Sequence, residues 1–362
     1  MHSSRQWTLW LLALCVLPLL LQQGGNGWVR IADTALLYVL LAVGLNIVVG
    51  YAGLLDLGYV AFFAVGAYLY ALLASPHLME TFEWLAVALP GGLHTPLWLV
   101  IPAAAALAGL VGVLLGAPTL KLRGDYLAIV TLGFGEIIRV FLNNLDHPVN
   151  LTNGPKGLGA IDPVTVFGHP LSRRLDLGFM DLPSVTLYYY LFLLLVVLAV
   201  VFSHRLETSR IGRAWMAIRE DEIAARAMGI DTRNLKLLAF GMGATLGGVS
   251  GTLFASFQGF VSPESFSLME SVMIVAMVVL GGLGHLPGVI LGAVLLSALP
   301  EVLRYTVGPL MSLTDGRLDP AILRQLLIAL AMILIMLWRP RGLWPAPEHD
   351  VSTGSPSQGD RA

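Results

Sequence analysis

Long apolar runs separated by short polar segments dominate this 362-residue sequence. A helix needs about 20 apolar residues to cross the hydrocarbon core of a bilayer. Because only 12% of the residues are charged, against about 25% in an average soluble domain, a soluble fold would expose large apolar surfaces. The sequence therefore predicts an all-α integral membrane protein, a polytopic bundle of about ten transmembrane helices. The ten candidate spans are 7–21, 33–50, 57–75, 97–116, 125–142, 186–203, 237–258, 270–283, 288–303 and 321–338.

Several of these spans are short or interrupted by glycine and could form re-entrant or half-length helices. Membranes tolerate such helices only where they are buried in protein or line a cavity. Residues 7–21 have the length of a signal-peptide core. No A-x-A cleavage pattern precedes Gln22, so we expect an uncleaved first span. The membrane domain is predicted to cover residues 1–344. Residues 345–362 are rich in Pro, Ser, Gly and charge, which predicts a disordered cytoplasmic tail.

Basic residues concentrate in segment 203–236, which holds seven of the 21 Lys and Arg residues. If the N-terminus is cytoplasmic, cytoplasmic segments hold thirteen basic residues and external segments seven, in agreement with the positive-inside rule. We therefore predict that both termini are cytoplasmic. The external segment 143–185 contains five prolines, too many for one long helix. We expect it to form a cap of turns and short helices, which either docks a soluble partner or covers the helix ends.

Small residues recur at four-residue spacing within the apolar runs, which favours close packing of helix backbones. The three sets are Gly112 and Gly116; Gly243, Gly247 and Gly251; and Gly284, Gly288 and Gly292.

Three ionisable residues lie close to the predicted membrane core, where they are costly and therefore candidates for a role in transport. Asp56 stands where one span ends and the next begins, either as a translocation-path residue or as an interfacial turn or helix cap. Glu136 and Arg139 are three residues apart on one predicted helix, so they either line the path or form a structural pair.

The sequence lacks the motifs of the common hydrolytic and nucleotide-binding sites. It contains no G-x-x-x-x-G-K-[ST] phosphate loop, no H-E-x-x-H zinc motif and no G-x-S-x-G nucleophile elbow. The single cysteine, Cys15, excludes a disulfide framework and a cysteine metal site. The net charge of −2 does not indicate a nucleic acid partner. These observations favour a transport protein over an enzyme, with no metal or cofactor bound by the chain itself.

Segment 203–236 is predicted to be a cytoplasmic loop that contains one amphipathic helix over 212–229. Its apolar face would carry Trp215, Ile218, Ala225 and Met228, and Gly229 would end it. A lipid-bound surface helix is the alternative. The segment mixes seven basic with five acidic residues, and this balance favours docking to a protein.

Part of this segment resembles the EAA loop of ABC-importer permeases. Ala224 and Ala225 are followed, after three residues, by Gly229, although Ile223 replaces the Glu of the consensus. In that family the loop inserts into a cleft of the ATP-binding subunit. The resemblance therefore implies an ATPase-coupling surface. Its candidate residues are Arg213, Arg219, Glu220, Asp221, Glu222, Ala224, Ala225 and Gly229.

Longer stretches between residues 35 and 344 resemble the LivM-type permeases of high-affinity branched-chain amino-acid ABC importers. They include Gly44–Asn46, Tyr51–Tyr59, Leu122–Ile137, Gly154–Leu158, Gly212–Trp215, Arg219–Ala224, Gly259–Phe266 and Leu280–Gly284. The resemblance implies a bacterial inner-membrane permease for Leu, Ile and Val. Permeation of urea, amides or other amino acids in a related importer is the alternative, and an ion-coupled secondary transporter is the more distant one.

The same resemblance implies a set of partner subunits. These are a sister LivH-type permease, two ATP-binding subunits that hold ATP and Mg²⁺, and a periplasmic amino-acid-binding protein. The binding protein would dock near segments 143–185 and 259–269, and the substrate would pass between the two permease subunits.

Overall fold

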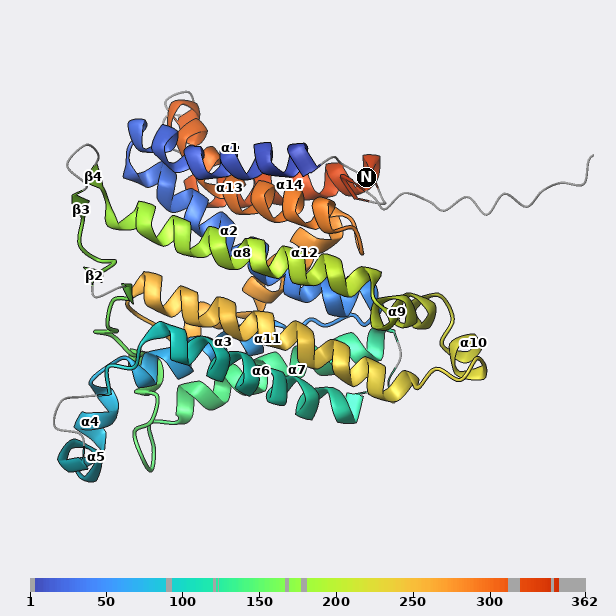
Figure 1. Cartoon of the computed structure of the whole chain (residues 1–362), viewed down its shortest axis with the longest axis horizontal. Coiled ribbons are helices and arrows are strands. Elements are labelled where there is room, and N and C mark those ends of the chain that lie inside the picture. Colours follow the sequence, from blue (N-terminus) through green and yellow to red (C-terminus); the bar gives the residue numbers. More distant parts are fainter. Residues whose placement is uncertain are drawn as a thin grey trace, which may run out of the picture.

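A computed structural model describes residues 4–88, 93–119, 122, 124–166, 169–176, 181–311, 320–339 and 342–344. Its long helices run roughly side by side in one bundle (Figure 1). Ten of them correspond one for one to the predicted spans, so the all-α membrane fold is confirmed. They are α1 (Ser4–Gln23), α2 (Asn26–Asn46), α3 (Val60–Leu73), α6 (Leu97–Thr119), α7 (Asp125–Asn144), α8 (Ser184–Thr208), α11 (Thr232–Gln258), α12 (Leu268–Gly281), α13 (Leu286–Met311) and α14 (Pro320–Trp338).

The spans differ in length in a way that the sequence only partly indicated. Within the described residues, five helices are both long and apolar enough to cross a membrane, namely α2, α6, α8, α11 and α13. The helix α2 continues without a break into a π-helical turn, η1 (Ile47–Tyr51). By contrast α3 and α12 have 14 residues each. They rise about 21 Å, less than the roughly 30 Å of a bilayer core.

The centre of the bundle consists of α2 and α11, whose backbones approach their neighbours through glycine. The helix α11 packs on α6, α3 and α2. A Cβ atom at Gly251 would lie 2.1 Å from the Phe63 carbonyl oxygen of α3, and one at Gly243 would lie 3.0 Å from the Gly44 carbonyl oxygen of α2. The predicted packing role of these small residues is confirmed, because an added Cβ atom would crowd the neighbouring helix at each of these distances. Gly284 is an exception, since it lies in the turn before α13 rather than on the helix.

One end of the bundle, here called the hairpin end, carries the segments between α7 and α8 and between α11 and α12. It contains two small antiparallel hairpins besides the expected turns and short helices. The two segments are joined by a β-bridge, in which Leu158 and Val261 exchange backbone hydrogen bonds of 2.8 and 2.9 Å. The elements at this end are α4 (His77–Thr81), α5 (Glu83–Ala88), η2 (Gly154–Lys156), β1 (Thr165–Val166), β2 (His169–Pro170), β3 (Leu175–Asp176), β4 (Asp181–Leu182) and η3 (Pro263–Phe266).

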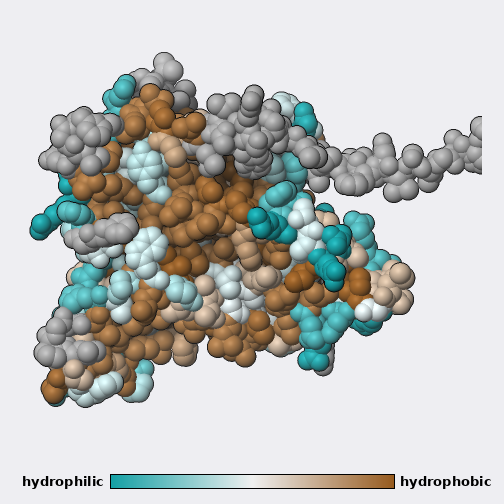
Figure 2. Space-filling model, in the orientation of Figure 1, coloured by the Kyte–Doolittle hydropathy of each residue, from teal (hydrophilic) through white to brown (hydrophobic). Residues whose placement is uncertain are grey.

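The opposite end carries two short helices, α9 (Arg210–Glu220) and α10 (Glu222–Ala227), which extend beyond the bundle. The helix α1 begins at this same end (Figure 1). Figure 2 shows apolar residues over the middle of the visible face and most of its polar residues toward the two ends. This distribution fits a bundle that crosses a membrane with both ends in water. The tail 345–362 lies outside the described residues.

Candidate functional site

The helix α9 is fixed to the end of the bundle by one cap, one glycine and one tryptophan. The Ser209 hydroxyl accepts a hydrogen bond from the Gly212 N–H at 3.1 Å and so caps the first turn. A Cβ atom at Gly212 would lie 2.3 Å from the Leu206 carbonyl oxygen, so only glycine allows this close approach to α8. Trp215 is fully buried and its Nε1–H donates to the Leu235 carbonyl oxygen at 2.7 Å. The charged segment is therefore an ordered extension of the bundle.

The prediction of one continuous helix over 212–229 is wrong, because the helix breaks at Asp221. This residue has extended backbone angles, and its Oδ1 accepts hydrogen bonds from the N–H groups of Ile223 and Ala224 at 2.8 and 3.1 Å. Asp221 is thus the N-cap of a second helix, α10. The break changes the helical register, so that Met228 is 83% exposed although it was expected on the buried face with Trp215.

Arg219 points back toward the bundle rather than away from it. Its Nη1 donates a hydrogen bond to the Gly50 carbonyl oxygen in η1. The same nitrogen lies 2.7 Å from where a Cβ atom would stand on Gly284, in the turn between α12 and α13. That turn is also held to α2, since the Gly284 N–H donates to the Asn46 Oδ1 at 3.0 Å. The C-terminal end of α9 therefore meets α2 and the α12–α13 turn at one place.

Glu222 connects α10 to the first turns of α11. One of its oxygens lies 2.7 Å from the Lys236 Nζ, and the other lies 3.1 Å from the Arg226 Nη2. The Lys236 side chain is only 7% exposed, and that of Glu222 is 19% exposed. Two charges with so little exposed surface stabilise each other, because an unpaired buried charge is strongly destabilising. Glu222 and Lys236 therefore form a structural pair.

The remaining predicted coupling residues divide between the interior and the surface. Ala225 is buried against the bundle, whereas Arg213, Glu220, Ala224 and Gly229 are exposed. Gly229 has a φ of +84°, a conformation that favours glycine, just after α10 ends.

Two apolar side chains that were not among the predicted coupling residues are exposed on α10 and just after it. Ile223 is 69% exposed and Met228 is 83% exposed at the polar end of the bundle. Because they lie at the polar end of the bundle rather than on its apolar middle, they are candidates for contact with a partner protein. The sequence did hold a sign of this exposure, since the Asp–Glu–Ile order after Glu220 allows Asp221 to cap a new helix. A new helix that begins there turns Ile223 and Met228 away from the bundle.

Asp56 is buried in the irregular segment between η1 and α3, with 1% of its surface exposed. Its Oδ1 accepts a hydrogen bond from the Gly58 N–H at 2.9 Å, which stabilises the turn that leads into α3. Its Oδ2 forms no hydrogen bond within the described part of the chain. The segment is held by α7 and α12, since the Leu57 N–H donates to Thr131 at 3.0 Å and Ser271 donates to the Leu57 carbonyl oxygen.

Glu136 and Arg139 form an ion pair along α7, with Nε and Nη2 of the arginine 2.9 and 2.8 Å from one glutamate oxygen. The two side chains are 34% and 37% exposed. The structure places Asp56 in the segment beside α7, but no bond joins it to this pair among the described residues. A role of these three residues in the translocation path stays a prediction.

The chain is similar to a known protein family and to individual permease proteins. A family model described as "Branched-chain amino acid transport system / permease component" matches residues 27–336. The permease protein LivM of the high-affinity branched-chain amino acid transport system of Escherichia coli K12 is 41% identical, over 99% of this chain and 80% of its own length. The LivH permease protein of the same system and strain is 26% identical over 91% of this chain and 96% of its own length.

A more distant relative is the probable branched-chain amino acid transport permease protein LivM of Methanocaldococcus jannaschii. It is 25% identical over 85% of this chain and 90% of its own length. No solved structure matches the chain.

Proposed function

Because this chain belongs to the family of branched-chain amino acid transport system permease components, we propose that it conducts leucine, isoleucine and valine across a bacterial inner membrane. The observation that carries the proposal is the extent of the match, which runs from the start of α2 into α14 and includes the α9–α10 segment. The chain acts as one permease subunit, and a sister LivH-type permease completes the translocation path.

Energy for transport comes from two ATP-binding subunits, which bind ATP and Mg²⁺ and hydrolyse the nucleotide. These subunits contact the outer face of α9 and α10, where Ile223 and Met228 are exposed. A displacement of α9 reaches α2 and the α12–α13 turn through Arg219. Closure of the ATP-binding subunits would therefore shift the bundle between discrete packings that open toward opposite sides of the membrane.

A periplasmic binding protein delivers the substrate to the hairpin end. The β-bridge between Leu158 and Val261 joins the two segments that were expected to receive it. In this orientation both chain termini and the α9–α10 segment are cytoplasmic, which agrees with the distribution of basic residues.

The test is uptake into lipid vesicles that contain this chain, the sister permease, the ATP-binding subunits and the binding protein. We expect accumulation of leucine, isoleucine and valine when ATP is supplied to the α9–α10 side, and no accumulation of urea. Matched vesicles that lack only the ATP-binding subunits should show none. Uptake of leucine by vesicles that hold this chain alone with an ion gradient would contradict the proposal.

A further inference from the structure

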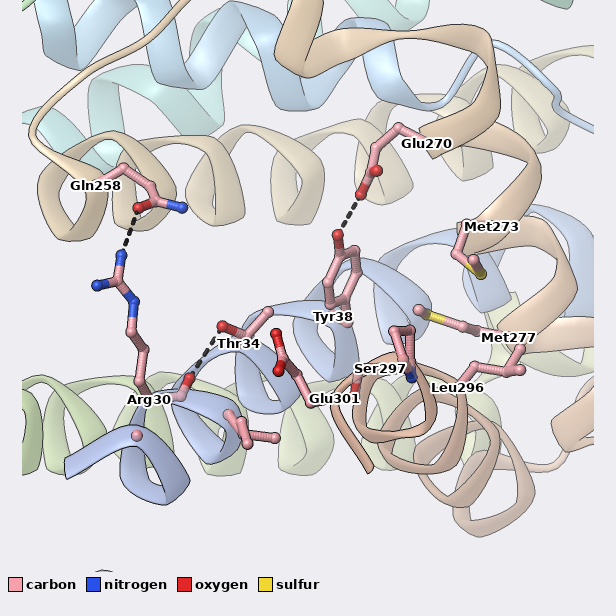
Figure 3. Close-up of a pocket in the computed structure, with 13 residues that line it drawn as sticks. Arg30, Thr34, Tyr38, Gln258, Glu270, Met273, Met277, Leu296, Ser297 and Glu301 are labelled. Carbon is pink, nitrogen blue, oxygen red and sulfur yellow. Dashed lines mark hydrogen bonds between the residues drawn. The ribbon is translucent and has the colours of Figure 1, made fainter. Parts of the chain in front are cut away.

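A cavity of about 550 Å³ lies between α2, α11, α12 and α13 (Figure 3). Its volume falls in the range of about 300–1,000 Å³ that is usual for small-molecule sites. It is separate from the segment around Asp56 and from the Glu136–Arg139 pair, none of which lines it.

Ionisable side chains from three different helices line this one cavity. Arg30 comes from α2, Glu270 from α12 and Glu301 from α13. Arg30 is exposed near the start of α2, whereas Glu270 is part-buried on α12. Ionisable residues that face a common cavity between membrane helices are candidates for a functional site. In Figure 3, Arg30 and Gln258 lie on one side of the space, and Glu270 lies on another.

Arg30 is positioned as a cation that can receive an anionic ligand group. Its Nη2 donates to the Gln258 Oε1 at 3.0 Å, and its guanidinium carbon lies 5.5 Å from the centre of the Phe257 ring. Within the described residues it forms no salt bridge. A guanidinium group has five N–H donors, so a carboxylate can be bound in addition to these contacts.

The opposite charge is supplied by Glu270, which lies across the cavity from Arg30. The Tyr38 hydroxyl donates to the Glu270 Oε1 and so fixes this side chain at the edge of the cavity. A carboxylate accepts hydrogen bonds at both oxygens, which leaves capacity for an ammonium group. Glu301 reaches the same space from α13.

Part of the remaining lining is apolar and flexible. Met273 and Met277 come from α12, and Leu296 comes from α13. Methionine side chains adapt to irregular apolar shapes because they are unbranched and polarizable. The lining can therefore accept aliphatic side chains of different branching.

We propose that this cavity binds a zwitterionic amino acid with an aliphatic side chain during its passage through the permease. Arg30 binds the α-carboxylate, Glu270 binds the α-ammonium group, and the methionines contact the side chain. The inference rests on the proposed transport function and adds to it a binding site within the membrane subunit. The membrane subunit then contributes to substrate selection together with the binding protein.

The first experiment measures binding of radioactive L-leucine to the purified permease complex without the binding protein. Arg30→Met is expected to weaken binding at least tenfold, and Arg30→Lys should recover part of the loss because it keeps the charge. Arg205→Met, an exposed arginine at the far end of α8, is the matched control and should bind like the wild type. Neither 4-methylpentanoate nor 3-methylbutylamine, which each lack one charge of leucine, should compete at equal concentration.

A second measurement does not depend on how well the charge variants fold. In a Cys15→Ser background, which removes the only native thiol, Ser297→Cys places a reactive group in the cavity lining. L-leucine should slow its labelling by a water-soluble maleimide at least threefold. Protection by phospholipid but not by leucine would overturn the proposal, as would wild-type affinity in Arg30→Met.

The two proposals can fail separately. If wild-type vesicles with all partners do not take up leucine, the transport function is wrong. If they take up leucine while Arg30→Met binds it normally and leucine does not protect Ser297→Cys, only the cavity assignment is wrong.

Discussion

The ion pair between Glu222 and Lys236 allows a quantitative test of how α10 is attached to the bundle. The change is Glu222→Gln, which keeps the size of the side chain and removes its charge. Lys236, with a side chain only 7% exposed, would then be a buried cation without its partner. Breaking a buried pair from one side costs about 3–5 kcal/mol. Because Glu222 itself is 19% exposed and water can reach it, we expect a cost of about 3 kcal/mol.

The assay is hydrogen exchange of the full-length chain in lipid nanodiscs. The reporters are the amides of Met228 and Ile230, which donate to the Ala224 and Ala225 carbonyl oxygens at 3.0 and 3.1 Å. If these amides exchange through local opening of α10, a loss of about 3 kcal/mol in the free energy of opening raises the exchange rate by about two orders of magnitude.

Arg226→Gln is the matched control, because Arg226 bonds to the same glutamate, and to the Thr232 hydroxyl, but its side chain is 65% exposed. An exposed i,i+4 pair contributes about 0.3–0.5 kcal/mol, so exchange should rise only about twofold. The double variant Glu222→Leu with Lys236→Met removes both buried charges and should return within about 1 kcal/mol of the wild type. Similar exchange in Glu222→Gln and Arg226→Gln, or no recovery in the double variant, would refute the structural role of the pair.

Three further changes test other parts of the structure. Gly66→Ala would place a Cβ atom 1.9 Å from a backbone oxygen of α11 and should cost about 1–3 kcal/mol. Its thermal unfolding midpoint should fall, whereas Gly133→Ala on α7, with nothing within 4 Å, should not lower it. Asp56→Asn keeps an oxygen acceptor for the turn before α3, so we expect an unchanged midpoint, and unchanged leucine uptake would count against a path role. Arg219→Ala removes the contact of α9 with the end of α2 and should lower the leucine molecules moved per ATP hydrolysed. A constant ratio would show that coupling runs elsewhere.

The positions of the ten membrane helices could be predicted because each depends on a local apolar run. Their lengths were less predictable, since the end of a helix depends on its neighbours. The run 57–75 looked continuous, yet α3 begins only at Val60. Thr131 and Ser271 from α7 and α12 bond to Leu57 and hold the preceding residues in an irregular conformation.

The candidate site could likewise be predicted only where it depends on a local pattern. Burial of Trp215, Ile218 and Ala225 followed from the spacing of apolar residues and is confirmed. The break at Asp221 was missed, because an aspartate can lie on the polar face of a helix as well as cap a new one. Arg219 and Gly50 are 169 residues apart in sequence. No local pattern could have predicted a bond between them.

The β-bridge between Leu158 and Val261 has a mechanical consequence. It joins the segment between α7 and α8 to the segment between α11 and α12, and a Cβ atom on the adjacent Gly157 would lie only 2.4 Å from the Val261 carbonyl oxygen. Four membrane helices, α7, α8, α11 and α12, are therefore linked through one bridge at this end. A protein that binds either segment acts through that bridge on helices from both halves of the sequence.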